Sequence, residues 1–325
     1  MNRRDFIQKT GVAATPLLFG GLLSACTPSS KTEEKKVDST STAALTTEPS
    51  IKNFGLQLWT VKEDMLIDPK GTLKALAGYG YKQIESFQSE KGIFWGMKPA
   101  EFKMLLDDLG MTIISSHCDS QYSLDPKKFD EFKKLADDAA SAGLKYLINP
   151  YLGFLKTLDE FKKATEGFNK QGEVLKASGM RFAYHNHHYS FTKMDGQFPQ
   201  DIMINGSNPE TVDFEMDMYW VTAAKQNPIE WLKKYPNRFK LCHIKDIYGA
   251  DKVAEIQKSE KVNPDFPINA SCILGTGTID FAKILPVAKD NGVQYFIVEQ
   301  ERFDKGTRLE SVDADAAYMK KLVFA

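Results

Sequence analysis

Short β-rich segments alternate with amphipathic helical segments along most of this 325-residue chain, and this alternation constrains the fold more than any other feature. Eight segments are rich in aliphatic, aromatic and β-branched residues and are expected to be strands: residues 55–59, 82–86, 112–116, 146–149, 181–185, 212–216, 239–244 and 295–299. Strands that alternate with helices pair in parallel through right-handed crossovers. Eight such units predict an α/β protein with a single (β/α)8 TIM barrel.

Amphipathic segments between the strands are expected to form the helices, for example residues 99–109, 126–142, 158–177 and 279–289. Glycines end several of these apparent helices, and the next strand begins within three residues: Gly80, Gly110, Gly143, Gly179 and Gly292. Glycine in this position is typical of a helix C-cap. An open doubly wound sheet is the alternative, but it would need a glycine-rich phosphate loop after the first strand, and residues 56–60 contain no glycine.

The first fifty residues differ from the rest of the chain and are expected to lie outside the barrel. Residues 1–26 have the pattern of a signal peptide: Arg3 and Arg4 resemble a twin-arginine signal, and residues 12–23 are apolar. The Leu-Ser-Ala-Cys sequence at 23–26 resembles a lipobox. We therefore expect export to the periplasm or outer membrane, with a lipid anchor on Cys26. Residues 27–50 contain eleven Ser and Thr but no aromatic residue, which predicts a flexible tether before a barrel at 51–325.

All five histidines lie at or just past the end of a predicted strand: His117, His185, His187, His188 and His243. Glu85, Asp217 and Glu299 occupy similar positions on three other strands. A barrel brings the carboxyl ends of its strands together around one mouth, where active sites lie. Converging imidazole and carboxylate groups suit Zn²⁺, Mn²⁺, Co²⁺ or Fe²⁺. The sequence therefore predicts a divalent metal site.

From residue 54 to about residue 322 the chain resembles the xylose isomerase-like barrels, which include sugar isomerases, epimerases and their relatives. The resemblance rests on five short motifs in the expected order: Tyr-His-Asn-His at 184–187, Met-Asp-Met-Tyr-Trp at 216–220, His-Ile-Lys-Asp at 243–246, Gly-Thr-Gly-Thr-Ile-Asp at 275–280 and Val-Glu-Gln-Glu at 298–301. Four of them lie on the fifth to eighth predicted strands, and the fourth motif precedes the last barrel helix.

The resemblance also implies which residues hold the metal. In the epimerases of this family, side chains from strands five to eight bind one divalent ion. Carried over to this chain, the ligands are His185, Asp217, His243 and Glu299, and the ion is expected to be Mn, Co, Zn, Fe or Mg. The chain departs from the family on strand five, where His185 stands at the position usually held by glutamate. His187 points to the same side two residues later and is the alternative ligand.

The resemblance implies proton abstraction next to a carbonyl, with the glutamates of strands five and eight exchanging the proton. Because His185 replaces one of these glutamates and a metal-bound imidazole is a poor base, the symmetric mechanism does not transfer. The remaining candidates for proton transfer lie at the ends of strands three, five and eight: His117, His187, Glu299 and Glu301. Lys245 is expected to neutralise a developing oxyanion. We expect a metal-dependent isomerase or epimerase of a keto-sugar or, as the alternative, a lyase or hydratase of 3-keto-glycosides.

Side chains near the barrel mouth are candidates for contacts with a sugar. Aromatic residues there can pack on the C–H faces of a sugar ring: Trp59, Phe87, Tyr151 and Trp220. Polar residues there can bond to its hydroxyl groups: Gln57, Glu85, Asn186 and Arg302. Residues 251–272 are a long insertion with little periodicity, expected to be a lid or a surface elaboration. Cys118 and Cys242 adjoin histidines but are expected to be buried and inert.

Two other function classes agree less well with the sequence. A metal-dependent endonuclease on this barrel needs a three-zinc site with more ligands than five histidines spread in this way supply. The net charge of −1 also provides no basic excess for nucleic acid. A non-catalytic glycan-binding lipoprotein would have no need of Asp217, His243 and Glu299 together. The expected partners are a small sugar or glycoside and, through the lipid anchor, the membrane.

Overall fold

Eight parallel strands close into a barrel in the computed structural model, which describes residues 48–261 and 268–324. The strands follow one another in the order β1-β10-β7-β6-β5-β4-β3-β2, so the first and last barrel strands are neighbours. Their bounds are β1 Gly55–Gln57, β2 Gln83–Phe87, β3 Thr112–His117, β4 Tyr146–Asn149, β5 Arg181–His185, β6 Val212–Asp217, β7 Phe239–Ile244 and β10 Tyr295–Val298. The predicted (β/α)8 barrel is confirmed, and every predicted strand overlaps an observed one.

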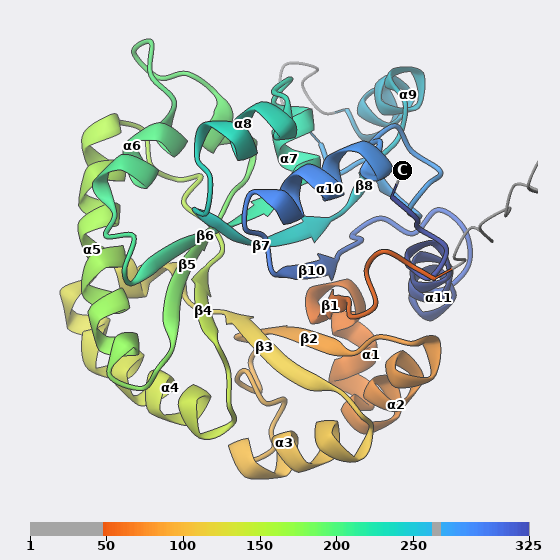
Figure 1. Ribbon diagram of the computed structural model, residues 1–325, viewed down its shortest axis with the longest axis horizontal. Coiled ribbons are helices and arrows are strands. Elements are labelled where there is room, and N and C mark those ends of the chain that lie inside the picture. The colour runs from red at the N-terminus through yellow and green to blue at the C-terminus, as the bar shows by residue number, and fades with distance from the viewer. Residues whose placement is uncertain (1–47, 262–267, 325) are drawn as a thin grey trace, which may run out of the picture. The chain divides into compact units, whose positions relative to one another are not determined.

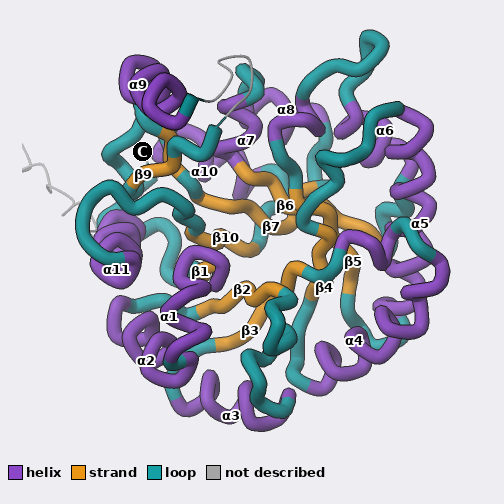
Figure 2. Tube along the Cα trace, turned by 180° about the vertical axis from the view of Figure 1, so that it is seen from behind, coloured by secondary structure: helices purple, strands orange, loops and turns teal. Residues whose placement is uncertain are grey.

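Helices surround the barrel and connect its strands (Figure 1, Figure 2). The α-helices are α1 Lys62–Ile67, α2 Pro69–Tyr79, α3 Pro99–Asp108, α4 Phe129–Ser141, α5 Leu158–Lys176, α6 Pro199–Gly206, α7 Met218–Ala223, α8 Pro228–Lys234, α9 Ala250–Glu260, α10 Phe281–Asp290 and α11 Arg308–Met319. Short 3₁₀ helices cover Leu58–Val61, Ser120–Ser123, Pro126–Lys128 and His188–Phe191. The five glycines expected at helix ends all have positive φ, between 67° and 106°, which glycine adopts without steric cost.

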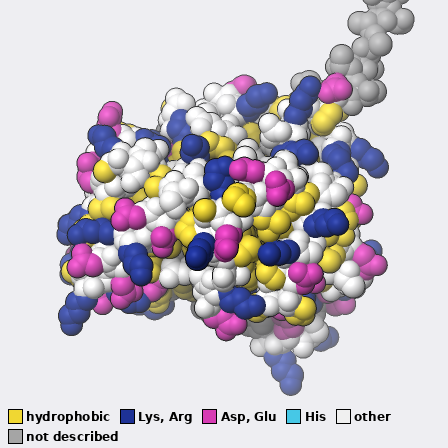
Figure 3. Space-filling model, turned by 90° about the horizontal axis from the view of Figure 1, so that it is seen from below, with side chains coloured by type: hydrophobic (Ala, Val, Ile, Leu, Met, Phe, Trp, Pro, Cys, Tyr) yellow, Lys and Arg dark blue, Asp and Glu magenta, His cyan; other side chains and the backbone are white. Residues whose placement is uncertain are grey.

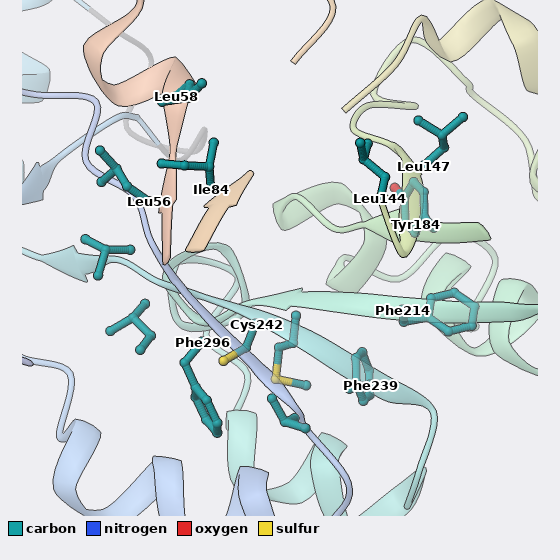
Figure 4. Packing of buried hydrophobic residues seen from close by; sticks show 14 of the residues in the cluster. Leu56, Leu58, Ile84, Leu144, Leu147, Tyr184, Phe214, Phe239, Cys242 and Phe296 are labelled. Carbon is teal, nitrogen blue, oxygen red and sulfur yellow. The ribbon is translucent and has the colours of Figure 1, made fainter. Parts of the chain in front are cut away.

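Side chains of the barrel strands alternate between two hydrophobic regions. Outward-facing residues such as Phe214 and Phe239 belong to the large core between the barrel and the helices, seen from close by in Figure 4. A smaller cluster fills the inside of the barrel: Ile114, Tyr146, Ile148, Ala183, Leu241 and Ile297. Beyond Leu241, the inward face carries His243 on β7 and then Lys245, which directly follows the strand. The barrel therefore has an apolar floor below a polar mouth.

A two-stranded antiparallel hairpin follows β7 and is formed by β8 (Asp246–Ile247) and β9 (Ser271–Cys272). Residues 251–272, for which little periodicity was expected, contain most of the helix α9, which lies beside the hairpin at the edge of the barrel (Figure 2). Its apolar side packs through Ile256 against Ile268 and Ala270. The helix α9 is therefore held by an apolar contact to the residues that lead into β9, which in turn bond to the Tyr219 hydroxyl of α7.

The Asp246 carboxylate joins this hairpin to the motif at 275–280. Its Oδ2 accepts the backbone N–H groups of Gly275 and Gly277 at 2.9 and 3.0 Å. Its Oδ1 accepts those of Ile247 and Ile279 at 2.9 and 3.1 Å. A Cβ at Gly277 would lie 2.3 Å from Asp246 Oδ1, so the close approach requires glycine. The motif at 275–280 thus serves to fix the chain directly after β7.

The predicted signal peptide, the lipobox cysteine Cys26 and nearly all of the tether lie outside the described residues. Within residues 48–261 and 268–324, no helix combines the length and the apolar character needed to cross a membrane. The three cysteines of this part are buried and free: Cys118, Cys242 and Cys272. Burial raises the pKa of each of these thiols, which keeps them protonated and unreactive.

Basic and acidic side chains are intermixed on the face of the molecule seen in Figure 3. A surface that binds a polyanion would instead present a continuous basic field. This face agrees with the balanced net charge of the chain and provides no such field.

Asp315 on α11 gives a testable pH effect on stability. Its Oδ1 accepts the backbone N–H of Leu274 at 2.8 Å, whereas its buried Oδ2 has no partner among the described residues. Burial, together with the charge of Asp246, raises the pKa of Asp315 to about 7. Because the folded-state pKa is above the unfolded one, the fold loses stability as the pH rises from about 4 to about 7, at about 1.4 kcal/mol per pH unit. We expect Asp315→Asn to raise the melting temperature at pH 8 but not at pH 4.

The matched control is Asp313→Asn, which changes an exposed aspartate on the same helix. Melting curves of the three proteins at pH 4, 6 and 8 provide the measurement. If Asp315→Asn and the wild type show the same pH dependence, Asp315 is ionised in the fold and the explanation is wrong.

Candidate metal centre and substrate pocket

A pocket of about 670 Å³ opens at the carboxyl ends of the barrel strands. Its walls come from the ends of every barrel strand except β6, or from the loops that follow them, and include Trp59, Phe87, His117, Tyr151, His185, His187, Lys245, Glu299 and Glu301. This is the mouth at which (β/α)8 barrels carry their active sites. The volume lies within the range of pockets that hold small molecules, roughly 300–1,000 Å³.

Potential metal ligands meet at the base of this pocket: Asp217 ends β6, His243 lies on β7 and Glu299 follows β10. His243 Nδ1 is 3.3 Å from Glu299 Oε2 and 3.9 Å from Asp217 Oδ2. His185 Nε2, at the end of β5, is 3.9 Å from the same Asp217 oxygen. That oxygen is buried and has no hydrogen-bond partner among the described residues. An unpartnered buried carboxylate oxygen facing two imidazoles and a second carboxylate fits a divalent cation.

The other nitrogens of the two imidazoles are held by buried carboxylates. His243 Nε2 is 2.7 Å from Glu85 Oε1, and His185 Nδ1 is 3.0 Å from Glu215 Oε2. Histidines that bind metals usually donate their second N–H group to a carboxylate or carbonyl, which fixes the tautomer and the ring orientation. Both rings are therefore already oriented with their other nitrogen 3.9 Å from Asp217 Oδ2.

A second group of potential ligands lies directly beside the first and consists of His117, His185, Glu215 and His243. Glu215 Oε2 is 3.0 Å from His117 Nε2, 3.0 Å from His185 Nδ1 and 3.3 Å from His243 Nε2. These are hydrogen-bond distances, and in His185 and His243 they involve the nitrogens turned away from Asp217. We infer that Glu215 orients the imidazoles and that the first group holds the metal.

Glu215 was missed in the sequence analysis, although a signal for it was present. Asp213, Glu215 and Asp217 alternate along β6, and alternate residues of a strand face the same side. Since Asp217 was expected to face the barrel mouth, the same alternation places Glu215 one layer below it. Ser115, which donates a hydrogen bond to Glu85 at 2.5 Å, belongs to the same buried layer and was also missed.

Paired substitutions can separate the two groups of potential ligands. In Asp217→Asn the metal loses a charged ligand, and we expect the purified protein to contain little divalent metal. In Glu215→Gln only the support of the histidines is weakened, and we expect metal to be retained with affinity lowered about 10–100-fold. Elemental analysis and competition with a metal-binding dye measure both effects. The opposite ranking of the two variants would place the metal in the second group.

The pKa values of the ionisable groups at the bottom of the pocket are shifted in different directions. Burial alone would lower the pKa of His117, but the charge of Glu85 and hydrogen bonds to Glu215 and Glu85 raise it to about 9. Burial and the charge of Glu85 raise the pKa of Glu215 to about 7, whereas the two histidine partners of Glu85 keep its own pKa well below the usual range. Burial also raises the pKa of Asp217 to about 7. His117 is therefore a cationic donor at neutral pH rather than a base.

Lys245 places a buried ammonium group beside the potential metal ligands. Its Nζ is 3.0 Å from Glu299 Oε2 and 4.0 Å from Asp217 Oδ2, and it also pairs with Glu301. Burial would lower the pKa of Lys245, but the charges of Glu299 and Glu301 raise it well above its usual value. The ammonium lies about 5 Å from the ring centres of Tyr219 and Trp220, which shield it from water.

Aromatic rings form two walls of the pocket. On one side Trp59 packs edge-on against Phe87, with ring centres 5.0 Å apart. On the other side Tyr151 packs edge-on against His187 at 5.2 Å, and His187 in turn stacks on Trp220 at 5.1 Å. His187 thus belongs to the wall and to neither group of potential ligands. Burial lowers its pKa to about 3, so the ring is neutral and only a weak base.

Several residues expected to contact a substrate lie outside the pocket lining, and that expectation is revised. Gln57 and Glu85 are fully buried and bonded to each other at 2.8 Å. The side-chain amide of Asn186 donates a hydrogen bond to the carbonyl of Asp217 and accepts one from its backbone N–H. Trp220 lies behind His187, and Arg302 pairs with Asp304 and Glu260 near the surface. The polar groups of Gln57, Glu85, Asn186 and Arg302 thus support the site or the surface, whereas Trp220 Nε1 is buried without a partner among the described residues.

Comparisons with known proteins agree with this geometry. The family model described as xylose isomerase-like TIM barrel matches residues 73–322. The inosose dehydratase of Clostridium perfringens (strain ATCC 13124) is 32% identical over 147 residues, which are 44% of this chain and 48% of that protein. The chain thus spans about half the length of the curated relatives that it matches.

Solved structures extend the similarity over more of the chain. A sugar phosphate isomerase/epimerase from Parabacteroides distasonis is 29% identical, with a TM-score of 0.71 over 88% of this chain and 97% of that one. An IolI protein solved with a zinc atom is 18% identical, with a TM-score of 0.64 over 82% of this chain and 95% of that one. The second likeness is one of fold.

Proposed function

Because this chain belongs to the xylose isomerase-like TIM barrel family, we propose that it is a divalent-metal-dependent enzyme acting on a keto-sugar. In this proposal the enzyme removes a proton next to the carbonyl and expels a leaving group from the neighbouring carbon. The observation that carries the proposal is the convergence of Asp217, His243 and Glu299 beside Lys245 at the base of the pocket. The similarity to inosose dehydratases supports an elimination.

The residues of the first group, together with His185, would hold the cation: Asp217, His243, Glu299 and His185. A divalent ion held by these residues would supply Lewis-acid stabilisation of negative charge on the substrate carbonyl oxygen. Glu85 and Glu215 keep the imidazoles oriented, so little rearrangement is needed on binding.

Glu299, Lys245 and Glu301 form the proton path in the proposal. Lys245 Nζ bridges the two carboxylates, and Trp59 Nε1 donates to Glu301 Oε1 at 3.0 Å. Glu299 takes the proton from carbon, Lys245 passes one of its own protons to Glu301 and is reprotonated by Glu299, and Glu301 protonates the leaving oxygen. The C–H and C–O bonds break and a C=C bond forms, so the proton lost from carbon ends on the leaving group.

The asymmetry of the site favours elimination over epimerisation. Epimerisation by two bases needs a group on each side of the reacting carbon. On the β5 side, His185 gives one nitrogen to Glu215 and turns the other toward Asp217, and His187 is a weak base. The proposal therefore relies on the two carboxylates beside Lys245, Glu299 and Glu301, which both lie on the β10 side.

A sugar isomerase or epimerase is the second candidate. It is favoured by the 29% identity with the sugar phosphate isomerase/epimerase structure, which extends over 88% of this chain. In the isomerase case the proton would return from Glu299 to the neighbouring carbon on the same side, with no loss of a leaving group.

The test is elemental analysis of the purified protein, followed by incubation with free keto-sugars and with 3-keto-glycosides in D2O. Elimination predicts about one divalent metal per chain, release of the aglycone and an unsaturated or hydrated product. Isomerisation predicts a deuterium-labelled isomer with the aglycone retained. A protein without metal that turns over none of these compounds would sink both candidates and favour a non-catalytic glycan-binding protein.

We also propose that the chain is exported and anchored to the membrane by a lipid on Cys26. The support is the pattern of residues 1–26 alone. Metabolic labelling with a radioactive fatty acid is expected to mark the wild type and not Cys26→Ser, and the variant is expected to leave the membrane fraction. Equal labelling of both proteins would contradict the anchor.

A further inference from the structure

A second, smaller pocket of about 300 Å³ adjoins the substrate pocket. The two pockets share Trp59 and Glu301, whose side chains are joined by the hydrogen bond from Trp59 Nε1 to Glu301 Oε1. This bond links the loop after β1 to the loop after β10, so it forms a partition with one pocket on each side. A ligand that occupies both pockets must lie across Glu301.

The lining of the second pocket suits a hydroxylated ring. Two potential donors line it: Lys62 Nζ, which lies over the Trp59 ring 3.7 Å from its centre, and the Asn269 amide nitrogen; neither has a hydrogen-bond acceptor among the described residues. Phe303 supplies an aromatic ring to the same lining, and the Arg308 guanidinium lies 6.0 Å from its centre. Arg308 is balanced by its ion pair with Glu63, so the pocket carries no strong excess of charge. Donors, a carboxylate acceptor and an aromatic surface together are the groups that recognise a neutral sugar.

We infer that the second pocket binds the second unit of a two-unit glycoside whose first, oxidised unit reacts in the substrate pocket. This inference rests on the proposed function. Its geometry gives Glu301 a place beside the bond that breaks, because the oxygen between the two units would lie against the partition. An enzyme for a free monosaccharide would have no use for this pocket, so the substrate class is a disaccharide-like glycoside.

The test is direct binding, measured by calorimetry with unoxidised probes that cannot react. The single-unit probe is methyl β-glucoside, and the two-unit probes are methyl β-cellobioside and methyl α-maltoside. The wild type is expected to bind one two-unit probe at least about 10-fold more tightly than the single-unit probe. In Lys62→Ala/Phe303→Ala this advantage is expected to disappear while the affinity for methyl β-glucoside is unchanged. Lys74→Ala, an exposed lysine on α2, is the control.

Equal affinities for the single-unit and two-unit probes in the wild type, including no measurable binding of any of them, would overturn the inference. An equal loss of affinity for all probes in the double variant would overturn it as well, because it would indicate general damage to the site. Failure of the proposed function has a different signature: the two-unit preference would be present, but no metal and no turnover of 3-keto-glycosides would be found.

Discussion

Replacing His243 with alanine is expected to remove the bound divalent metal and the enzymatic activity together. His243 is the residue shared by both groups of potential ligands, with Nδ1 3.3 Å from Glu299 and Nε2 2.7 Å from Glu85. Removing a residue that merely supports a metal ligand costs about 10–100-fold, so loss of the ligand itself should exceed about 100-fold in metal affinity and in kcat/KM. Elemental analysis and turnover of keto-sugars provide the two readouts.

The matched control is His188→Ala, since His188 is a half-buried histidine on the same rim that belongs to neither group of ligands. It is expected to keep its metal and most of its activity. Because His243→Ala also leaves Glu85 without one of its partners, melting temperatures of both variants show whether they are folded. Full turnover by a folded, metal-free His243→Ala protein would exclude the metal-dependent mechanism.

Replacing Lys245 with methionine is expected to separate metal binding from catalysis. The buried ammonium lies 3.0 Å from Glu299 and 4.0 Å from Asp217, so its removal leaves more negative charge around the metal site. We expect metal affinity to stay the same or to rise. We expect kcat to fall about 10²–10³-fold, because the charge that stabilises the oxyanion and relays the proton is lost.

The control for this substitution is Lys240→Met, which changes a half-buried lysine at the other end of β7. Breaking a buried ion pair costs about 3–5 kcal/mol, so a lower melting temperature of Lys245→Met is expected and does not by itself count against the proposal. The decisive comparison is kcat at saturating metal. If kcat of the folded, metal-loaded variant equals that of the wild type, Lys245 has only a structural role.

The barrel and the position of the site could be predicted because both follow from local patterns. Hydrophobic segments of strand length and glycines with positive φ mark the units, and residues at strand ends must meet in a closed barrel. His185, Asp217 and His243 illustrate this: each ends or nearly ends its strand, and the structure brings them to one point.

The depth of Glu85 in the barrel could not be predicted, because it depends on the stagger between neighbouring strands. Glu85 pairs with Ser115 after a register shift between β2 and β3. It is fully buried and bonded to Gln57 and Ser115, whereas alternation along β6 alone indicates that Glu215 lies below Asp217. A sequence shows that a glutamate is near a strand end, but not whether it lines the cavity or lies beneath it.

A partner from a distant segment explains why Arg302 does not line the pocket. Arg302 was expected at the barrel mouth, but its guanidinium pairs with Glu260 at the end of α9 and with Asp304. The helix α9 lies in the stretch for which little periodicity was expected, so this partner could not be foreseen. The charged end of a long basic side chain can be placed by whichever carboxylates lie within its reach.

The four amides that converge on Asp246 also determine how this part of the barrel moves. The backbone groups of Ile247, Gly275, Gly277 and Ile279 can exchange their hydrogens with solvent only when the carboxylate releases them. Since Lys245 directly precedes Asp246, the same four hydrogen bonds restrain the backbone that carries the ammonium. The β7 side of the mouth should therefore be rigid. Motion that admits or releases ligands is then expected at the exposed side chains of Tyr151 and Trp59.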